Sequence, residues 1–128
     1  MEIKIKNKRI DVKKLQSTIN SMMPERDKMF IAMNRFKIVL GAESTFEDIW
    51  RSRDSNLNDV TGFLTFSLIK GEANDDYSLY ASHTTWKSKL DFTNWTKSEA
   101  FRKAHKGAGS HSEIYLGNPV FEGFETVI

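Results

Sequence analysis

The chain contains no cysteine among its 128 residues. This excludes a disulfide scaffold, thiolate catalysis, and any zinc or iron–sulfur site held by cysteine. The N-terminus alternates Ile and Lys without the uninterrupted apolar run of a signal peptide, and no later stretch approaches membrane-spanning length. We therefore expect a soluble, cytoplasmic protein with no membrane partner.

Neither sign of charge predominates, with 19 Lys and Arg against 17 Asp and Glu. The formal net charge is +2, which is too small to indicate binding to nucleic acid, although Lys and Arg are crowded between positions 4 and 14. Aromatic residues, by contrast, are plentiful: nine Phe, three Trp and three Tyr. They provide material for a wide apolar cavity or a buried subunit interface.

The length and the 39% hydrophobic content fit one compact domain, which we place at 29–128 after an N-terminal extension at 1–28. In the extension, Ile3 and Ile5 alternate with lysines as in a short strand. A helix-like apolar stripe precedes Pro24 and consists of Val12, Leu15, Ile19 and Met22. The extension either packs on the main domain or on a partner subunit, or it is a solvated basic arm.

Residues 29–128 predict alternating strands and helices. We expect strands at 29–40, 60–70, 77–86 and 120–128, a helix opened by Ser44 and Glu47, a hairpin loop at 71–76, and helices at 89–95 and 97–106. The first helix carries Phe46, Ile49 and Trp50 at core spacing, with Arg51 and Arg53 toward solvent or the rim of a pocket. The order β-α-β-β-α-β predicts an α+β, ferredoxin-like domain. Its sheet has one bare face, which a homodimer would bury.

The segment 85–107 holds the strongest local signals. Ser88 with Asp91, and Thr96 with Glu99, have the spacing of capping boxes, and Gly107 is a helix stop. His105 lies one turn beyond Phe101 on the same side of the second helix, and Trp95 ends the first. The pair also has a purely structural interpretation. Trp95 would then be a core residue, and His105 a half-exposed residue favoured by the helix dipole.

Asn34 is the polar exception on a mostly apolar strand face formed by Phe30, Ala32, Phe36 and Ile38. An unpaired buried carboxamide costs about 1–3 kcal/mol, so Asn34 needs either a structural partner or a ligand. No glycine-rich phosphate loop follows a strand, and His83, His105 and His111 lack the spacing of a zinc site. An imidazole beside aromatic side chains is the arrangement that would suit haem iron.

Several segments together carry a family resemblance: Asn34-Arg35-Phe36, Phe46–Trp50, Gly62-Phe63, Trp86-Lys87-Ser88, Phe92–Trp95, Ser98–Phe101 and Ala104-His105. Over about residues 29–128 the chain resembles the antibiotic biosynthesis monooxygenase (ABM) superfamily, and specifically its IsdG-like haem-degrading monooxygenases. The most specific part is Trp95 ten positions before His105, combined with Asn34 in the first strand. Trp86 also matches the family, with a structural role.

The resemblance implies a dimeric α+β barrel with one haem in each subunit. His105 would be the axial ligand of the iron, Trp95 would press on the porphyrin, and Asn34 would hydrogen-bond on the distal side, with Phe36 and Phe101 completing the haem site. Haem would be both substrate and oxygen-activating cofactor, O2 the co-substrate, and a reductase the external electron donor, with iron released for acquisition. The chain departs from short family members in its first 28 residues and in the glycine-rich loop after His105.

Two other functions remain open at this point. Cofactor-free members of the same superfamily oxidise quinols or other aromatic substrates in the same cavity. A haem-binding carrier without turnover is the third function that the residues allow.

Overall fold

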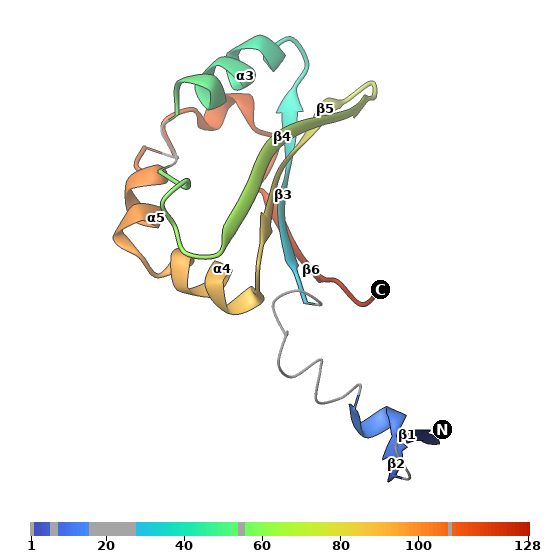
Figure 1. Cartoon of the computed structure of the whole chain (residues 1–128). Coiled ribbons are helices and arrows are strands. Elements are labelled where there is room, and N and C mark those ends of the chain that lie inside the picture. Colours follow the sequence, from blue (N-terminus) through green and yellow to red (C-terminus); the bar gives the residue numbers. More distant parts are fainter. Residues whose placement is uncertain (1, 6–7, 16–27, 54–55, 108) are drawn as a thin grey trace.

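The computed structural model describes residues 2–5, 8–15, 28–53, 56–107 and 109–128. The main domain follows the predicted order β-α-β-β-α-β (Figure 1). Its elements are β3 (Phe30–Val39), α3 (Glu43–Ser52), β4 (Phe63–Ala73), β5 (Tyr77–Trp86), α4 (Lys89–Thr96), α5 (Glu99–Ala104), the 3-10 turn η1 (Ser112–Ile114) and β6 (Val120–Glu125).

The four strands form one antiparallel sheet in the order β4-β5-β3-β6. Consecutive strands β3 and β4 are therefore not neighbours, and β3 lies between β5 and β6. This is the ferredoxin-like arrangement, so the predicted fold class is confirmed. The helices α3, α4 and α5 all lie on one side of the sheet, and its other face has no covering layer in the described chain (Figure 1).

Two apolar clusters lie between the helices and the sheet. One contains Phe30, Ala32, Leu57, Trp86 and Trp95. The other contains Phe36, Ile38, Phe46, Tyr80 and Ile114. On β3 the predicted alternation holds, and the polar residue Asn34 stands between the contributions of β3 to the two clusters. The inner face of the sheet is thus polar where the two clusters meet.

The helix caps agree only in part with the sequence signatures. Ser88 caps α4 as predicted, because its Oγ accepts a hydrogen bond from the Asp91 N–H at 3.1 Å. The prediction of Ser44 as the cap of α3 was wrong, since the helix begins at Glu43 after Ala42 and no side chain caps it. Gly41, at a φ of +92°, makes the turn that leads into this earlier start.

Thr96 is likewise not the cap of α5. The helix α4 runs through Thr96, whose hydroxyl donates to the Thr93 carbonyl oxygen at 2.6 Å. Ser98 takes the capping position, and its Oγ accepts from the Phe101 N–H at 3.2 Å. As a result α5 spans Glu99–Ala104 and is shorter than the predicted 97–106. Gly107 follows at a φ of +81°, as expected for a helix stop.

Strand boundaries differ by three residues at three places, while β3 is only one residue shorter than predicted at each end. The strand β4 begins at Phe63 and runs to Ala73, so it includes part of the segment predicted as a hairpin loop. The loop is shorter because Asn74 makes the turn, accepting hydrogen bonds from the N–H groups of Asp76 and Tyr77. The last strand, β6, ends at Glu125 and not at Ile128.

In the N-terminal extension, β1 (Glu2–Ile5) confirms the predicted short strand. It pairs antiparallel with β2 (Lys8–Asp11), which the alternation did not predict, and a helical turn occupies 12–15. The rest of the predicted helical stripe, from Ile19 to its end at Pro24, lies outside the described residues. Among the described helices, none has the length and apolar content needed to cross a membrane.

Candidate functional site

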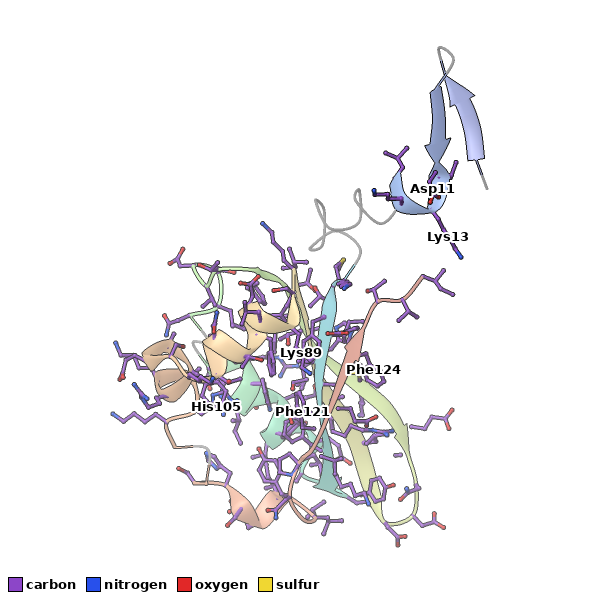
Figure 2. All side chains as sticks on the ribbon, turned by 90° about the horizontal axis from the view of Figure 1, so that it is seen from below. Asp11, Lys13, Lys89, His105, Phe121 and Phe124 are labelled. Carbon is purple, nitrogen blue, oxygen red and sulfur yellow. The ribbon has the colours of Figure 1, made fainter. Side chains whose placement is uncertain are left out.

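A cavity of about 820 Å³ lies between the inner face of the sheet and the helices. Its lining includes all of the site residues named from the sequence, which come from three separate elements: Asn34, Phe36, Trp95, Phe101 and His105. Figure 2 shows His105 on the helix side and Phe121 on β6. The structure therefore brings together, in one space, residues up to 71 positions apart in the sequence.

Asn34 belongs to the sheet wall of the cavity. The strand alternation directs it to the same side as Ala32 and Phe36, which also line the space. Asn34 is half-buried, and its carboxamide makes no hydrogen bond to any residue that the structure describes. The sequence left two kinds of partner open for Asn34, a structural residue or a ligand, and the described residues include no structural partner.

His105 forms part of the helix wall. It is the C-cap residue of α5, and its Nδ1 lies 2.8 Å from the carbonyl oxygen of Phe101. A carbonyl can only accept, so Nδ1 carries the proton and donates it, and in the neutral ring Nε2 keeps its lone pair. Histidine ligands of metals are commonly oriented in this way, through a hydrogen bond from the other ring nitrogen to a backbone carbonyl.

Aromatic rings hold the imidazole in place. The Phe101 ring lies 4.1 Å from the His105 ring between centroids, and the Trp95 ring lies 5.9 Å away. Trp95 in turn packs edge-on against Phe101 at 4.8 Å and tilted against Trp86 at 5.3 Å. These contacts form a stiff aromatic wall around the histidine.

The two tryptophans of this wall differ in their polar atoms. Trp86 is fully buried, and its Nε1–H donates to Thr84 Oγ1 at 2.9 Å, which suits the structural role expected for it. Trp95 is 9% exposed, and its Nε1 is buried without a hydrogen-bond partner among the described residues. Such an unpaired donor costs about 1–3 kcal/mol, and so it is unusual in a residue with only a packing role.

The positively charged side chain of Arg53 belongs to the cavity lining. Its guanidinium carbon lies 4.5 Å from the centre of the Trp50 ring. Arg51 faces solvent instead, paired with Asp48 at 2.7 Å and Glu47 at 3.2 Å. Of the two arginines, only Arg53 can therefore meet a carboxylate of a ligand in this cavity.

Hydroxyl groups of β5 attach α3 to the sheet and so place Trp50 and Arg53. Ser78 donates to Glu43 at 2.7 Å, and Tyr80 donates to Glu47 at 2.5 Å. Burial, together with the Glu47 hydrogen bond, raises the pKa of Tyr80 above its ordinary value. The hydrogen bond from Ser78 lowers the pKa of Glu43.

Sequence reasoning missed several lining residues. Ser82 and Thr84 on β5 face the cavity, as do Tyr115 near η1 and Phe121 on β6. The available signal was the alternation of small hydroxyl residues, Ser78, Ser82 and Thr84, on one face of a predicted strand. Burial raises the pKa of the Tyr115 phenol.

The other two histidines lie elsewhere. His83 points to the opposite side of β5 from Ser82 and Thr84, and His111 is exposed; neither lines the cavity. Within the described ranges, no group of three or more His, Asp or Glu side chains is arranged to hold a metal ion.

The cavity suits a flat, largely apolar molecule with a ligatable metal and acidic substituents, such as haem. Its volume of about 820 Å³ falls within the roughly 300–1,000 Å³ typical of ligand pockets. His105 Nε2 is available to a metal, the aromatic wall matches a planar ring, and Arg53 can pair with a carboxylate. The residues that line the cavity therefore fit haem.

Comparisons with known proteins agree with the family resemblance of the sequence. The sequence profile of the family described as antibiotic biosynthesis monooxygenase matches residues 29–107. A protein of Bacillus anthracis (strain A0248), named heme-degrading monooxygenase, is 30% identical over 92 residues, covering 72% of this chain and 85% of that protein. A protein of the same name from Shouchella clausii (strain KSM-K16) is 37% identical over 59 residues, which are 46% of this chain and only 55% of that relative.

Solved structures share the fold. The heme-degrader MhuD of Mycobacterium tuberculosis, with two hemes bound in its active site, superposes with a TM-score of 0.59 at 23% identity, covering 77% of this chain and 96% of that one. SnoaB of Streptomyces nogalater, a cofactor-independent oxygenase, gives a TM-score of 0.55 at 18% identity, covering 75% and 90%. Together with the profile match over residues 29–107, these findings show that the chain belongs to the antibiotic biosynthesis monooxygenase family.

Proposed function

We propose that the chain is a haem-degrading monooxygenase. It would bind haem as substrate in the cavity between sheet and helices, and open the porphyrin ring with O2 and electrons from an external donor such as a reductase. Iron would be released, as in a route of iron acquisition. The observation that carries this proposal is His105, whose Nε2 is left free by the Nδ1 hydrogen bond and whose ring stands in the aromatic wall of the cavity.

His105 would bind the iron through Nε2. The Phe101 carbonyl fixes the tautomer and the orientation of the ring, because the hydrogen bond of 2.8 Å holds the proton on Nδ1. Once bound, haem supplies the iron centre at which O2 is activated. Acidification would weaken the binding, since a protonated imidazole has no lone pair for a metal.

The other cavity residues would orient the substrate and exclude water. Trp95, packed edge-on against Phe101, would contact the flat ring of the substrate and limit the positions that it can take. Phe36 packs from β3, and Arg53 pairs with a carboxylate substituent at the cavity edge. Asn34, which has no hydrogen-bond partner in the described chain, would donate its N–H2 group toward the oxygen-binding side.

A cofactor-free oxygenase is the second candidate. One observation favours it: the fold is shared with SnoaB, a cofactor-independent oxygenase. In that case a quinol or another aromatic substrate would occupy the cavity, with Asn34 and His105 as its polar contacts. The oriented Nε2 of His105 is better explained by a metal.

The proposal also includes a homodimer. The face of the sheet away from the helices carries the exposed apolar side chains Ile69, Val120 and Phe124. Monomeric proteins rarely leave a wide apolar sheet face in water. A second copy of the chain, packed face to face, would cover it.

The deciding experiment is a titration with haemin followed by absorption spectroscopy, with ascorbate or a reductase then added under air. A Soret band that appears and then bleaches with release of iron is expected. A stable band would identify a carrier, and no band would point to the cofactor-free class. His105→Ala should lose the wild-type spectrum, while His111→Ala, outside the cavity, should keep it.

A further inference from the structure

The sheet wall of the cavity carries three polar side chains: Asn34, Ser82 and Thr84. The hydroxyl of Thr84 is engaged on both sides. It donates to the Ala32 carbonyl oxygen at 3.3 Å and accepts from Trp86 Nε1 at 2.9 Å. Thr84 is therefore part of the scaffold, and its hydroxyl has no proton left to donate to a ligand.

Ser82 differs from Thr84 in this respect. It is 9% exposed, and its hydroxyl makes no hydrogen bond within the part of the chain that the structure describes. Among the described residues only Trp95 Nε1 is fully buried without a partner, so the Ser82 hydroxyl remains open to the cavity, where a ligand or a water molecule can pair with it. Asn34 shares both properties with Ser82: its side chain has no hydrogen-bond partner among the described residues, and it lines the cavity.

The two residues are direct neighbours. In the register of β3 and β5, Asn34 lies opposite Ser82, so their Cβ atoms are roughly 4.5–5.5 Å apart. The same row continues to Phe121 on β6 and Leu68 on β4, both apolar. An amide and a hydroxyl thus stand side by side in an otherwise apolar row, and both can reach one small polar group.

We propose that Ser82 is a second ligand contact, which forms with Asn34 a two-point hydrogen-bonding site on the sheet wall. With haem in the cavity, the site would take a small anion or polar diatomic group that the iron binds. This inference rests on the proposed function, because it assumes haem in the cavity. Ser82 contributes a donor of its own, and it does not act through Asn34.

Azide is a suitable probe because it binds ferric haem as an anion and accepts hydrogen bonds without any turnover. The cleanest comparison is Ser82→Thr against Ser82→Val, since these two side chains have nearly the same shape and differ in the hydroxyl. Ser67→Ala is the control, because Ser67 is exposed and lies opposite His83 on the other face of the sheet. Each haemin-loaded variant is titrated with azide and followed by its absorption spectrum.

The expected result is azide affinity about fivefold lower in Ser82→Val than in Ser82→Thr, the scale of one net hydrogen bond. Haemin affinity should be equal in the two variants, and Ser67→Ala should match the wild type. Equal azide affinities in the Thr and Val variants would overturn the inference while leaving the proposed function intact. A wild-type chain that binds no haemin would contradict both.

The Asn34→Ala background separates direct contact from an indirect role. If Ser82 touches the ligand, the difference between the Thr and Val variants persists when Asn34 is absent. If that difference vanishes, Ser82 only orients the carboxamide, and the assignment as a ligand contact is wrong.

Discussion

The imidazole of His105 is oriented by its own helix. The carbonyl that receives its Nδ1 proton belongs to Phe101, four residues earlier, and the same oxygen accepts the His105 backbone N–H at 3.1 Å. The ring therefore depends on the last turn of α5 and not on a distant partner. This hydrogen bond is local to α5, and the tertiary structure brings the helix to the cavity and the imidazole against Trp95 of α4.

Asn34→Ala should leave haem binding near the wild-type level and slow degradation. The alanine removes the donor but adds no bulk, and loss of one positioned donor commonly costs ~10²-fold in rate. Haemin titration and the rate of Soret bleaching with ascorbate measure the two effects separately. Asn94→Ala, an exposed asparagine on α4 outside the main cavity, is the matched control. Degradation at the wild-type rate in Asn34→Ala would show that the amide has no part in the reaction.

Trp95→Phe should retain haem and change its degradation. Phenylalanine keeps an aromatic contact with Phe101 and Trp86 but reduces the bulk that would distort the porphyrin, and it removes the unpaired Nε1–H. We expect an unchanged Soret position with slower bleaching or an altered product spectrum. The same rate and product as in the wild type would show that Trp95 only packs the wall.

At the scale of elements, a polar contact holds α3 to the sheet. Two carboxylates of α3, Glu43 and Glu47, accept hydrogen bonds from Ser78 and Tyr80 of β5. Phe46 of the same helix packs against Tyr80 with ring centroids 4.8 Å apart. The position of α3 decides where Trp50 and Arg53 meet the cavity, so this contact supports the site from outside it.

Stability at acid pH should reflect the contact between Ser78 and Glu43. The Ser78 hydrogen bond lowers the Glu43 pKa in the folded state from its ordinary value of 4.5. The unfolded chain then binds the proton more tightly, so the contribution is present above pH 4.5 and is lost as the pH falls through the folded pKa. Ser78→Ala should therefore flatten the fall in the free energy of unfolding below that pH.

Urea unfolding at a series of pH values measures this effect, with Ser67→Ala on the opposite sheet face as the control. If the free energy of unfolding falls equally steeply with acid in Ser78→Ala and in the wild type, the Ser78 hydrogen bond does not lower the pKa of Glu43.

At the scale of the whole molecule, the sheet has two unlike faces. Alternation along β6 puts Phe121 on the cavity side, stacked on Phe92 at 5.6 Å, and Phe124 on the other side (Figure 2). Phe124 is 47% exposed and Val120 is 56% exposed. An ion pair of Arg35 with Glu122, at 3.2 Å, lies among them on the same outer face.

We predict a homodimer formed through this outer face. Light scattering at micromolar concentration should give twice the monomer mass of 14.8 kDa. Phe124→Lys should lower that mass, because a charge would have to be buried in the interface. Val127→Lys, in the exposed tail after β6, should leave it unchanged.

A monomeric wild type would contradict this assembly. The extension at 1–28 would then be the candidate cover of the sheet, and its removal should cause association.

Local sequence patterns were sufficient for most elements of the region 29–128, but not for β2 in the N-terminal extension. Alternation marked β3 almost to its ends, the hairpin loop marked the start of β5, and Ser88 with Asp91 marked the start of α4, because these signals act over neighbouring residues. The fold class followed from their order. Asn34, Trp95 and His105 were named through the family resemblance, and the structure places them around one cavity.

Turn geometry, the extent of neighbouring helices and strand register decided the remaining features. Ser44 and Thr96 satisfy a capping pattern but do not cap, because the turn at Gly41 and the extent of α4 determine where each following helix begins. Ser82 could not be recognised as a neighbour of Asn34, since the register between β3 and β5 joins residues far apart in the chain. Which hydroxyl is engaged and which is free toward the cavity depends on that register and on Trp86, so only the folded chain distinguishes Thr84 from Ser82.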